Sequence, residues 1–137
     1  MKNVLKIVAI ISMLLLTVFA GGCGKSQEEK YTEARNEFVA LQQQFDKDYK
    51  EHNKEYNTGK NANKITPEYY ESYIKIVGNF QNEAEKKFQK MAEIAKGKLE
   101  LTKDLEQVKQ EYHKKYDFYL NLLPDAKERL KEIKAKK

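Results

Sequence analysis

From residue 27 onwards, apolar side chains recur at intervals of three and four residues, which is the spacing of one face of an α-helix. The first series consists of Tyr31, Ala34, Phe38, Leu41, Phe45, Tyr49, His52 and Tyr56. It predicts a helix from Gln27 to Asn57, about 45 Å long at 1.5 Å per residue, with His52 as a buried or half-buried core residue. Because no later stretch shows the strict alternation of a half-buried strand, the sequence predicts an all-α fold.

A second series begins and ends at clear signals. The segment Asn57 to Lys64 is rich in turn-forming residues and is predicted to be a loop. Thr66 and Pro67 then supply a capping oxygen and a ring suited to the first helical turn. Gly97 can adopt the left-handed conformation that ends a helix. The apolar members between these signals are Tyr70, Tyr73, Val77, Phe80, Ala84, Phe88, Met91 and Ala95.

A third series is stopped or kinked at Pro124, and it consists of Leu101, Leu105, Val108, Tyr112, Tyr116, Tyr119 and Leu123. Three amphipathic helices joined by short connections favour an antiparallel three-helix bundle of long helices over residues 28–123, followed by a basic C-terminal helix or tail over 124–137. The alternative is that Gly97 does not interrupt the helix, which would give a long helical hairpin or coiled coil. The polar gap at Lys96, Gly97 and Lys98 favours the bundle.

Folding these helices back on their connections predicts which side chains meet. The loop sets up three aromatic pairs, namely Tyr56 with Tyr70, Phe45 with Phe80 and Phe38 with Phe88. The turn at Gly97 sets the small Ala84 opposite the bulky Tyr112, as dense packing requires.

The amino terminus forms a separate unit. Lys2 and Lys6 precede the run Ile7 to Phe19, which has 13 residues with only two polar ones and is short for a membrane span of about 20 residues. Ala20, Gly21 and Gly22 then lead directly to Cys23, the single cysteine. This arrangement resembles the signal peptide of bacterial lipoproteins, whose lipobox places small residues before an invariant cysteine. Ala20 departs from the leucine that is most often found three residues before that cysteine.

The resemblance implies that diacylglycerol is attached to the thiol of Cys23 and that the chain is cleaved after Gly22. Residues 1–22 would then be a cleaved signal peptide, and residues 23–27 a lipidated tether. Two or three acyl chains are enough for stable anchoring. The expected location is the extracytoplasmic side of a bacterial cell membrane, and the Lys-, Asn- and Ile-rich composition favours a Gram-positive source.

The formal net charge of +5 does not indicate a nucleic-acid partner, because the charge is concentrated at the two ends. Residues 1–22 carry +2 and residues 127–137 carry +4, which leaves −1 for residues 23–126. Arg35 and Arg129 are the only arginines, so bidentate base contacts have few donors. We therefore expect no nucleic-acid binding.

Residues suited to catalysis or metal binding are also scarce. His52 and His113 are the only histidines, and neither belongs to the Glu-x-x-His pattern of di-iron bundles. The mature part contains no Gly-x-Ser-x-Gly nucleophile turn, and Gly24-Lys25-Ser26 lacks the upstream glycine of a phosphate-binding loop. The sequence predicts no enzyme, no cofactor and no metal site.

The tyrosines give the remaining functional indication. Eight of the nine fall in the half of the predicted bundle that is remote from Cys23. Tyrosine is favoured where surfaces meet partners, so Tyr56, Tyr69 and Tyr70 are the candidate contacts for an envelope protein or wall polymer, with Tyr69 expected to be exposed. The alternative is that the tyrosines fill a wide bundle. The expected function is a non-catalytic binding or structural module; the other hypothesis is a chaperone-like accessory factor that clasps client proteins.

Overall fold

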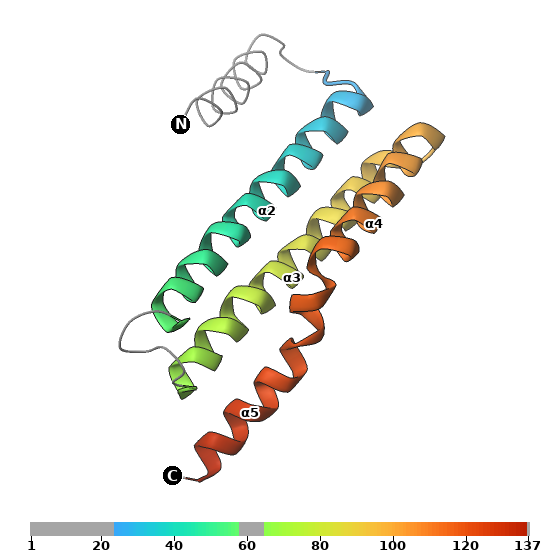
Figure 1. Ribbon diagram of the computed structural model, residues 1–137. Helices are drawn as coiled ribbons and strands as arrows, with labels where there is room; N and C mark the ends of the chain where they lie inside the picture. The colour runs from blue at the N-terminus through green and yellow to red at the C-terminus, as the bar shows by residue number, and fades with distance from the viewer. Residues whose placement is uncertain (1–23, 58–64, 137) are drawn as a thin grey trace, which may run out of the picture.

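The computed structural model describes residues 24–57 and 65–136, and this part of the chain consists of four helices without a strand (Figure 1). The helices are α2 (Gln27–Asn57), α3 (Pro67–Ala95), α4 (Leu99–Asn121) and α5 (Leu123–Ala135). The predicted all-α bundle is confirmed. The predicted signal peptide, Cys23 and residues 58–64 of the predicted loop lie outside the described residues.

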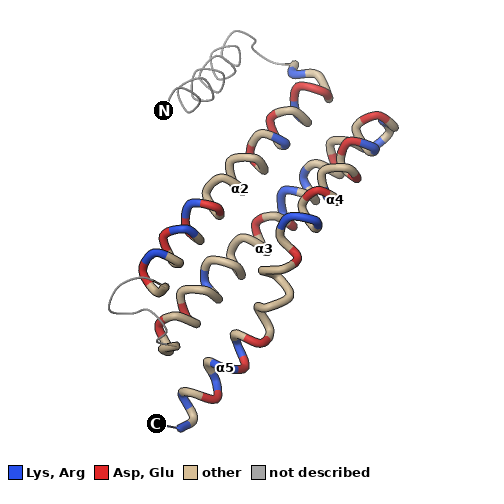
Figure 2. Tube along the Cα trace, viewed as in Figure 1, with Lys and Arg blue, Asp and Glu red and all other residues tan. Residues whose placement is uncertain are grey.

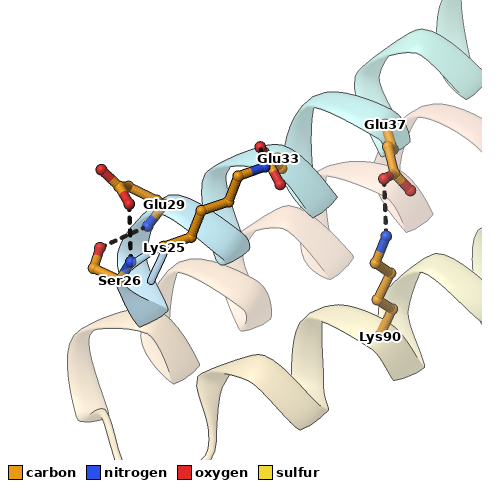
Figure 3. A network of polar contacts seen from close by, with 6 residues as sticks. All are labelled: Lys25, Ser26, Glu29, Glu33, Glu37 and Lys90. Atoms are coloured by element: carbon orange, nitrogen blue, oxygen red, sulfur yellow. Dashed lines mark hydrogen bonds and ion pairs between the residues drawn. The ribbon is translucent and has the colours of Figure 1, made fainter. Parts of the chain in front are cut away.

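Helix α2 begins at a capping box whose first residue, Ser26, belongs to the predicted tether of residues 23–27. The Ser26 Oγ accepts a hydrogen bond from the Glu29 backbone N–H at 3.1 Å, and the Glu29 carboxylate accepts one from the Ser26 N–H at 2.8 Å (Figure 3). Two amides that the first helical turn would leave unsatisfied are thereby bonded. Lys25 pairs with Glu33 along the same turns. This arrangement fixes the first helical residue as Gln27.

The α2–α3 interface follows the predicted register over most of its length. Phe45 stacks on Phe80 with ring centroids 4.2 Å apart, and Phe38 lies 4.8 Å from Phe88. Outside this core, Glu37 accepts hydrogen bonds from Lys87 and Lys90, each at 2.8 Å. Figure 3 shows the contact with Lys90. Both aromatic pairs were predicted from the sequence.

The helix break at Gly97 occurs as the bundle prediction requires. Gly97 has a φ of 80°, and the Lys98 N–H donates to the carbonyl of Ala95 at 3.0 Å, which closes a tight turn between α3 and α4. Helices α3 and α4 are therefore separate and antiparallel rather than one fused rod. At the other end of α3, the Thr66 hydroxyl caps the helix by accepting from the Tyr69 N–H at 3.3 Å.

Helix α4 packs on α3 around the fully buried Ala84. The ring of Tyr112 lies 5.7 Å from Phe80 and 5.1 Å from Phe88, one turn to either side of that alanine. Tyr112 thus occupies the space that the small side chain leaves, as predicted.

Large side chains bridge α2 and α4. Phe45 meets Tyr116 edge to face at 5.3 Å, and the Tyr31 hydroxyl donates to Asp104 at 2.9 Å. An ion pair between Lys115 and Asp46 at 2.7 Å adds to these contacts at the surface. The tyrosines therefore do fill part of a wide bundle, which was one of the two explanations considered for their number.

The C-terminal segment is a helix that lies along α3. Leu122 separates α4 from α5, Pro124 stands in the first turn of α5, and the buried Leu123 and Ala126 face the bundle. Lys134 of α5 pairs with Glu71 of α3 at 2.7 Å. Figure 2 shows both signs of charge interleaved along α2, α3, α4 and α5.

Candidate functional site: a tyrosine pocket

A pocket of about 540 Å³ opens at the end of the bundle where α2 ends and α3 begins. At this end α5 replaces α4 as the neighbour of α3 (Figure 1). Side chains of α2, α3 and α5 therefore line the space. We call it the tyrosine pocket, and its lining consists of Tyr49, Tyr56, Asn57, Ile65, Tyr69, Tyr70, Tyr73, Leu122, Asp125, Ala126 and Arg129. Its volume is within the range of roughly 300–1,000 Å³ that is typical of small-ligand sites.

The three candidate contact residues of the sequence analysis all line this pocket. Tyr56, Tyr69 and Tyr70 are each half-buried. The expectation that Tyr69 is exposed is wrong, because its ring lies 4.9 Å from His52 and 5.7 Å from Tyr56. Tyr69 therefore also takes the place beside Tyr56 that the sequence had assigned to Tyr70. The α2–α3 register prediction is off by one residue at this end.

The rings of the pocket stand nearly perpendicular to one another. Tyr56 and Tyr69 form an interplanar angle of 85°, and Tyr69 and Tyr70 one of 82° with centroids 5.3 Å apart. Such edge-to-face contacts are the preferred geometry of aromatic pairs and hold the rings in fixed orientations. The aromatic rings that line the pocket therefore differ in the orientation of their planes.

Carboxylates lie near Tyr56, and one of them, Asp125, lies in the pocket lining. Partial burial, and after it the negative charges of Glu55, Glu68 and Glu71, raise the pKa of the Tyr56 hydroxyl. On the opposite wall, Asp125 has no ion-pair partner in the described part of the chain. The Arg129 guanidinium lies 3.3 Å from Glu132 and is partly neutralised there.

Behind the aromatic wall lies His52, which is only 2% exposed. Its Nδ1 lies 2.9 Å from the Ser72 Oγ, and the rings of Tyr49, Tyr56, Tyr69 and Tyr73 surround it at 4.9–6.1 Å. Burial lowers the pKa of the imidazole, although the Glu55 charge opposes this effect. The prediction of a core histidine is confirmed, and the neutral ring acts as a support for the tyrosines.

A second hollow of about 490 Å³ lies between α2 and α3 and is lined by several acidic residues, among them Asp48, Glu51, Glu55 and Glu83. Among the described residues that line this hollow, Lys75 is the only lysine or arginine. Within residues 24–57 and 65–136, no group of three or more histidine, cysteine or acidic side chains is arranged to hold a metal ion. No helix of that same part is long and apolar enough to cross a membrane.

The polar wall of the tyrosine pocket was not predicted from the sequence. Asp125 and Arg129 lie one helical turn apart on α5, and this i, i+4 spacing was visible. What was not visible is that α5 lies along α3 and so turns these two side chains toward the tyrosines. Comparison of the chain with family models, curated proteins and solved structures gave no match.

Proposed function

We propose that this chain is a lipid-anchored binding module of a bacterial envelope, which holds a partner in the tyrosine pocket. The observation that carries this proposal is the convergence of five tyrosines from two helices on one pocket with a polar wall. Rigid aromatic surface beside a few polar groups is characteristic of recognition sites, because large contact area is gained with little loss of side-chain freedom.

The anchoring part of the proposal is supported by the lipobox-like sequence that ends at Cys23. Helix α2 begins four residues later and spans 31 residues, or about 46 Å at 1.5 Å per residue. An acyl group on Cys23 would thus lie at the opposite end of the bundle from the tyrosine pocket, which would point away from the membrane.

The alternative of a chaperone-like clasp for client proteins has less support. Such a clasp needs a broad apolar surface that is open to unfolded chains. The apolar faces of α2, α3 and α4 are instead turned toward one another, with Phe38, Val77, Met91 and Tyr116 almost fully buried. A pocket with a fixed lining supports the binding of a specific ligand more than the binding of unfolded chains.

The test is site-specific cross-linking in intact cells. A photoreactive phenylalanine analogue replaces Tyr56 in the full-length protein, and the matched control carries the same group at Leu99, which is 68% exposed at the α3–α4 turn. We expect a discrete adduct from position 56 that is absent from position 99. Equal adducts from both positions, or none from position 56, would contradict binding at the tyrosine pocket.

A further inference from the structure

The tyrosine pocket has features that select the charge of its ligand. Each aromatic face carries partial negative charge at its centre, so a cation above the face is attracted to it. Tyr56, Tyr69 and Tyr70 form two successive perpendicular pairs, at 85° and 82°. Rings in this arrangement offer faces to a bound group from more than one side, as a flat stack would not.

The full charges nearby favour the same sign of ligand. The carboxylate of Asp125 lines the pocket and pairs with no cation among the described residues. Glu55, Glu68 and Glu71 lie close enough to Tyr56 to act on its hydroxyl electrostatically, although Glu71 also pairs with Lys134 at 2.7 Å. Among the described residues that line the pocket, the one cation is Arg129, which pairs with Glu132 at 3.3 Å. Asp125 therefore supplies a charge that a cationic ligand can neutralise.

From this combination we infer that the tyrosine pocket binds a poorly hydrated organic cation, of the alkylated ammonium class. An alkylated ammonium group loses little hydration when it enters an aromatic pocket, whereas a primary ammonium or a metal ion would give up strong bonds to water. The apolar Ile65, Leu122 and Ala126 suit the methyl groups of such a ligand. This inference rests on the proposed binding function and assigns a ligand class to the same pocket.

The experiment compares choline with 3,3-dimethyl-1-butanol, which has the same shape but carries no charge. Each is titrated calorimetrically into the protein purified from cell membranes with its native amino terminus, in dodecyl maltoside micelles. Because the chain contains no tryptophan, a parallel change in intrinsic fluorescence reports on its tyrosines. We expect choline to bind and to perturb tyrosine emission, with the neutral isostere about tenfold weaker or more.

Variants locate the interaction within the molecule. Tyr69→Phe keeps the ring and is expected to keep the choline affinity within about twofold, whereas Tyr69→Leu is expected to weaken it about tenfold. Asp125→Asn is an exposed change on α5 that leaves the helix core untouched, and it is expected to weaken choline about fivefold while leaving the isostere unchanged. Phe118→Leu, at an exposed aromatic outside the pocket lining, is the control and should bind as the parent does.

The outcomes separate this inference from the proposed function. Equal affinity for choline and the isostere, or undiminished choline binding in Asp125→Asn and Tyr69→Leu, overturns the cation inference. Absence of choline binding together with a discrete adduct from position 56 also overturns it but leaves the binding module standing. Absence of both choline binding and the adduct overturns the two together. If Tyr69→Leu loses its helical circular dichroism, Asp125→Asn alone decides.

Discussion

The Nδ1 of His52 lies 2.9 Å from the Oγ of Ser72 across the α2–α3 interface, while its Nε2 is buried with no hydrogen-bond partner in the described part of the chain. The Nδ1 is thus satisfied, whereas the Nε2 has no group among the described residues to which it could donate a proton or from which it could accept one. Protonation would place a positive charge among four tyrosine rings without a buried counter-charge, and its cost is the reason that the pKa is lowered.

The first prediction concerns the stability of the bundle in acid. Because the folded pKa of His52 lies below the unfolded value of about 6.5, the unfolded chain binds more protons in this range. The contribution of His52 to stability is therefore present above about pH 6.5 and is lost as the pH falls through its folded pKa. Urea unfolding at pH 7.5 and pH 5 measures it. His52→Gln, which does not titrate, should reduce this pH dependence, and His113→Gln, which retains His52, should keep it; an undiminished slope in His52→Gln would contradict the assignment.

The second prediction concerns the space opposite Tyr112. Ala84 is completely buried between Phe80 and Phe88, so Ala84→Leu forces a larger side chain into a filled core. We expect the free energy of unfolding to fall by about 1–3 kcal/mol. The control is Ala40→Leu on the exposed face of α2, which should change it by no more than about 0.5 kcal/mol. Equal effects at the two positions would show that Ala84 is not tightly enclosed.

The third prediction compares two glycines that have free space where a Cβ would be added. Gly97 has a φ of +80°, whereas Gly78 lies inside α3. Gly97→Ala should destabilise the protein by about 1 kcal/mol, because the new side chain is strained in the left-handed region. Gly78→Ala should stabilise it by about 0.5–1 kcal/mol through helix propensity. Thermal unfolding of both variants measures the two changes in stability. Changes of the same sign would contradict the prediction.

The fourth prediction tests the proposed anchor. Cys23→Ser removes the thiol that would receive the diacylglyceryl group. We expect the variant to keep residues 1–22 and to lose the acyl mass, because lipidation precedes cleavage in the lipoprotein family that the leader resembles. Mass spectrometry of the purified native protein and of the variant measures both changes. An unmodified thiol or an intact methionine start in the native protein would refute the anchor.

The helical faces could be predicted because they depend on local spacing. The series that includes Phe38 and Phe45 fixes one side of α2, and the loop fixes where α3 must return, so the contacts with Phe88 and Phe80 follow. The two ends of α3 could be predicted for the same reason, because Thr66 and Gly97 each act within one turn of the chain. The capping box at Ser26 and Glu29 is such a signal as well and was overlooked.

The pocket could not be predicted, because its shape depends on tertiary packing. Pro124 predicts a break in the helix, but it does not predict the direction in which the chain continues after the break. Only the packing of α5 on α3 brings Asp125 close to tyrosines some fifty residues earlier. Tyr69 was expected to be exposed for a related reason, since its ring contacts His52 and Tyr56 of α2, and local spacing does not give such contacts across helices.

The capping box at Ser26 bears on how the protein would search its surroundings. With Cys23 acylated as proposed, the rigid helix α2 would start only a few residues from the lipid. A small change in the tilt of the bundle at the membrane would then move the pocket end over a larger distance. Over the length of α2, a tilt of about 30° displaces that tip sideways by roughly 23 Å. A molecule that does not diffuse laterally would then still bring its pocket to many positions above the bilayer. The number of ligands that it can reach would depend on the length of the bundle as much as on diffusion.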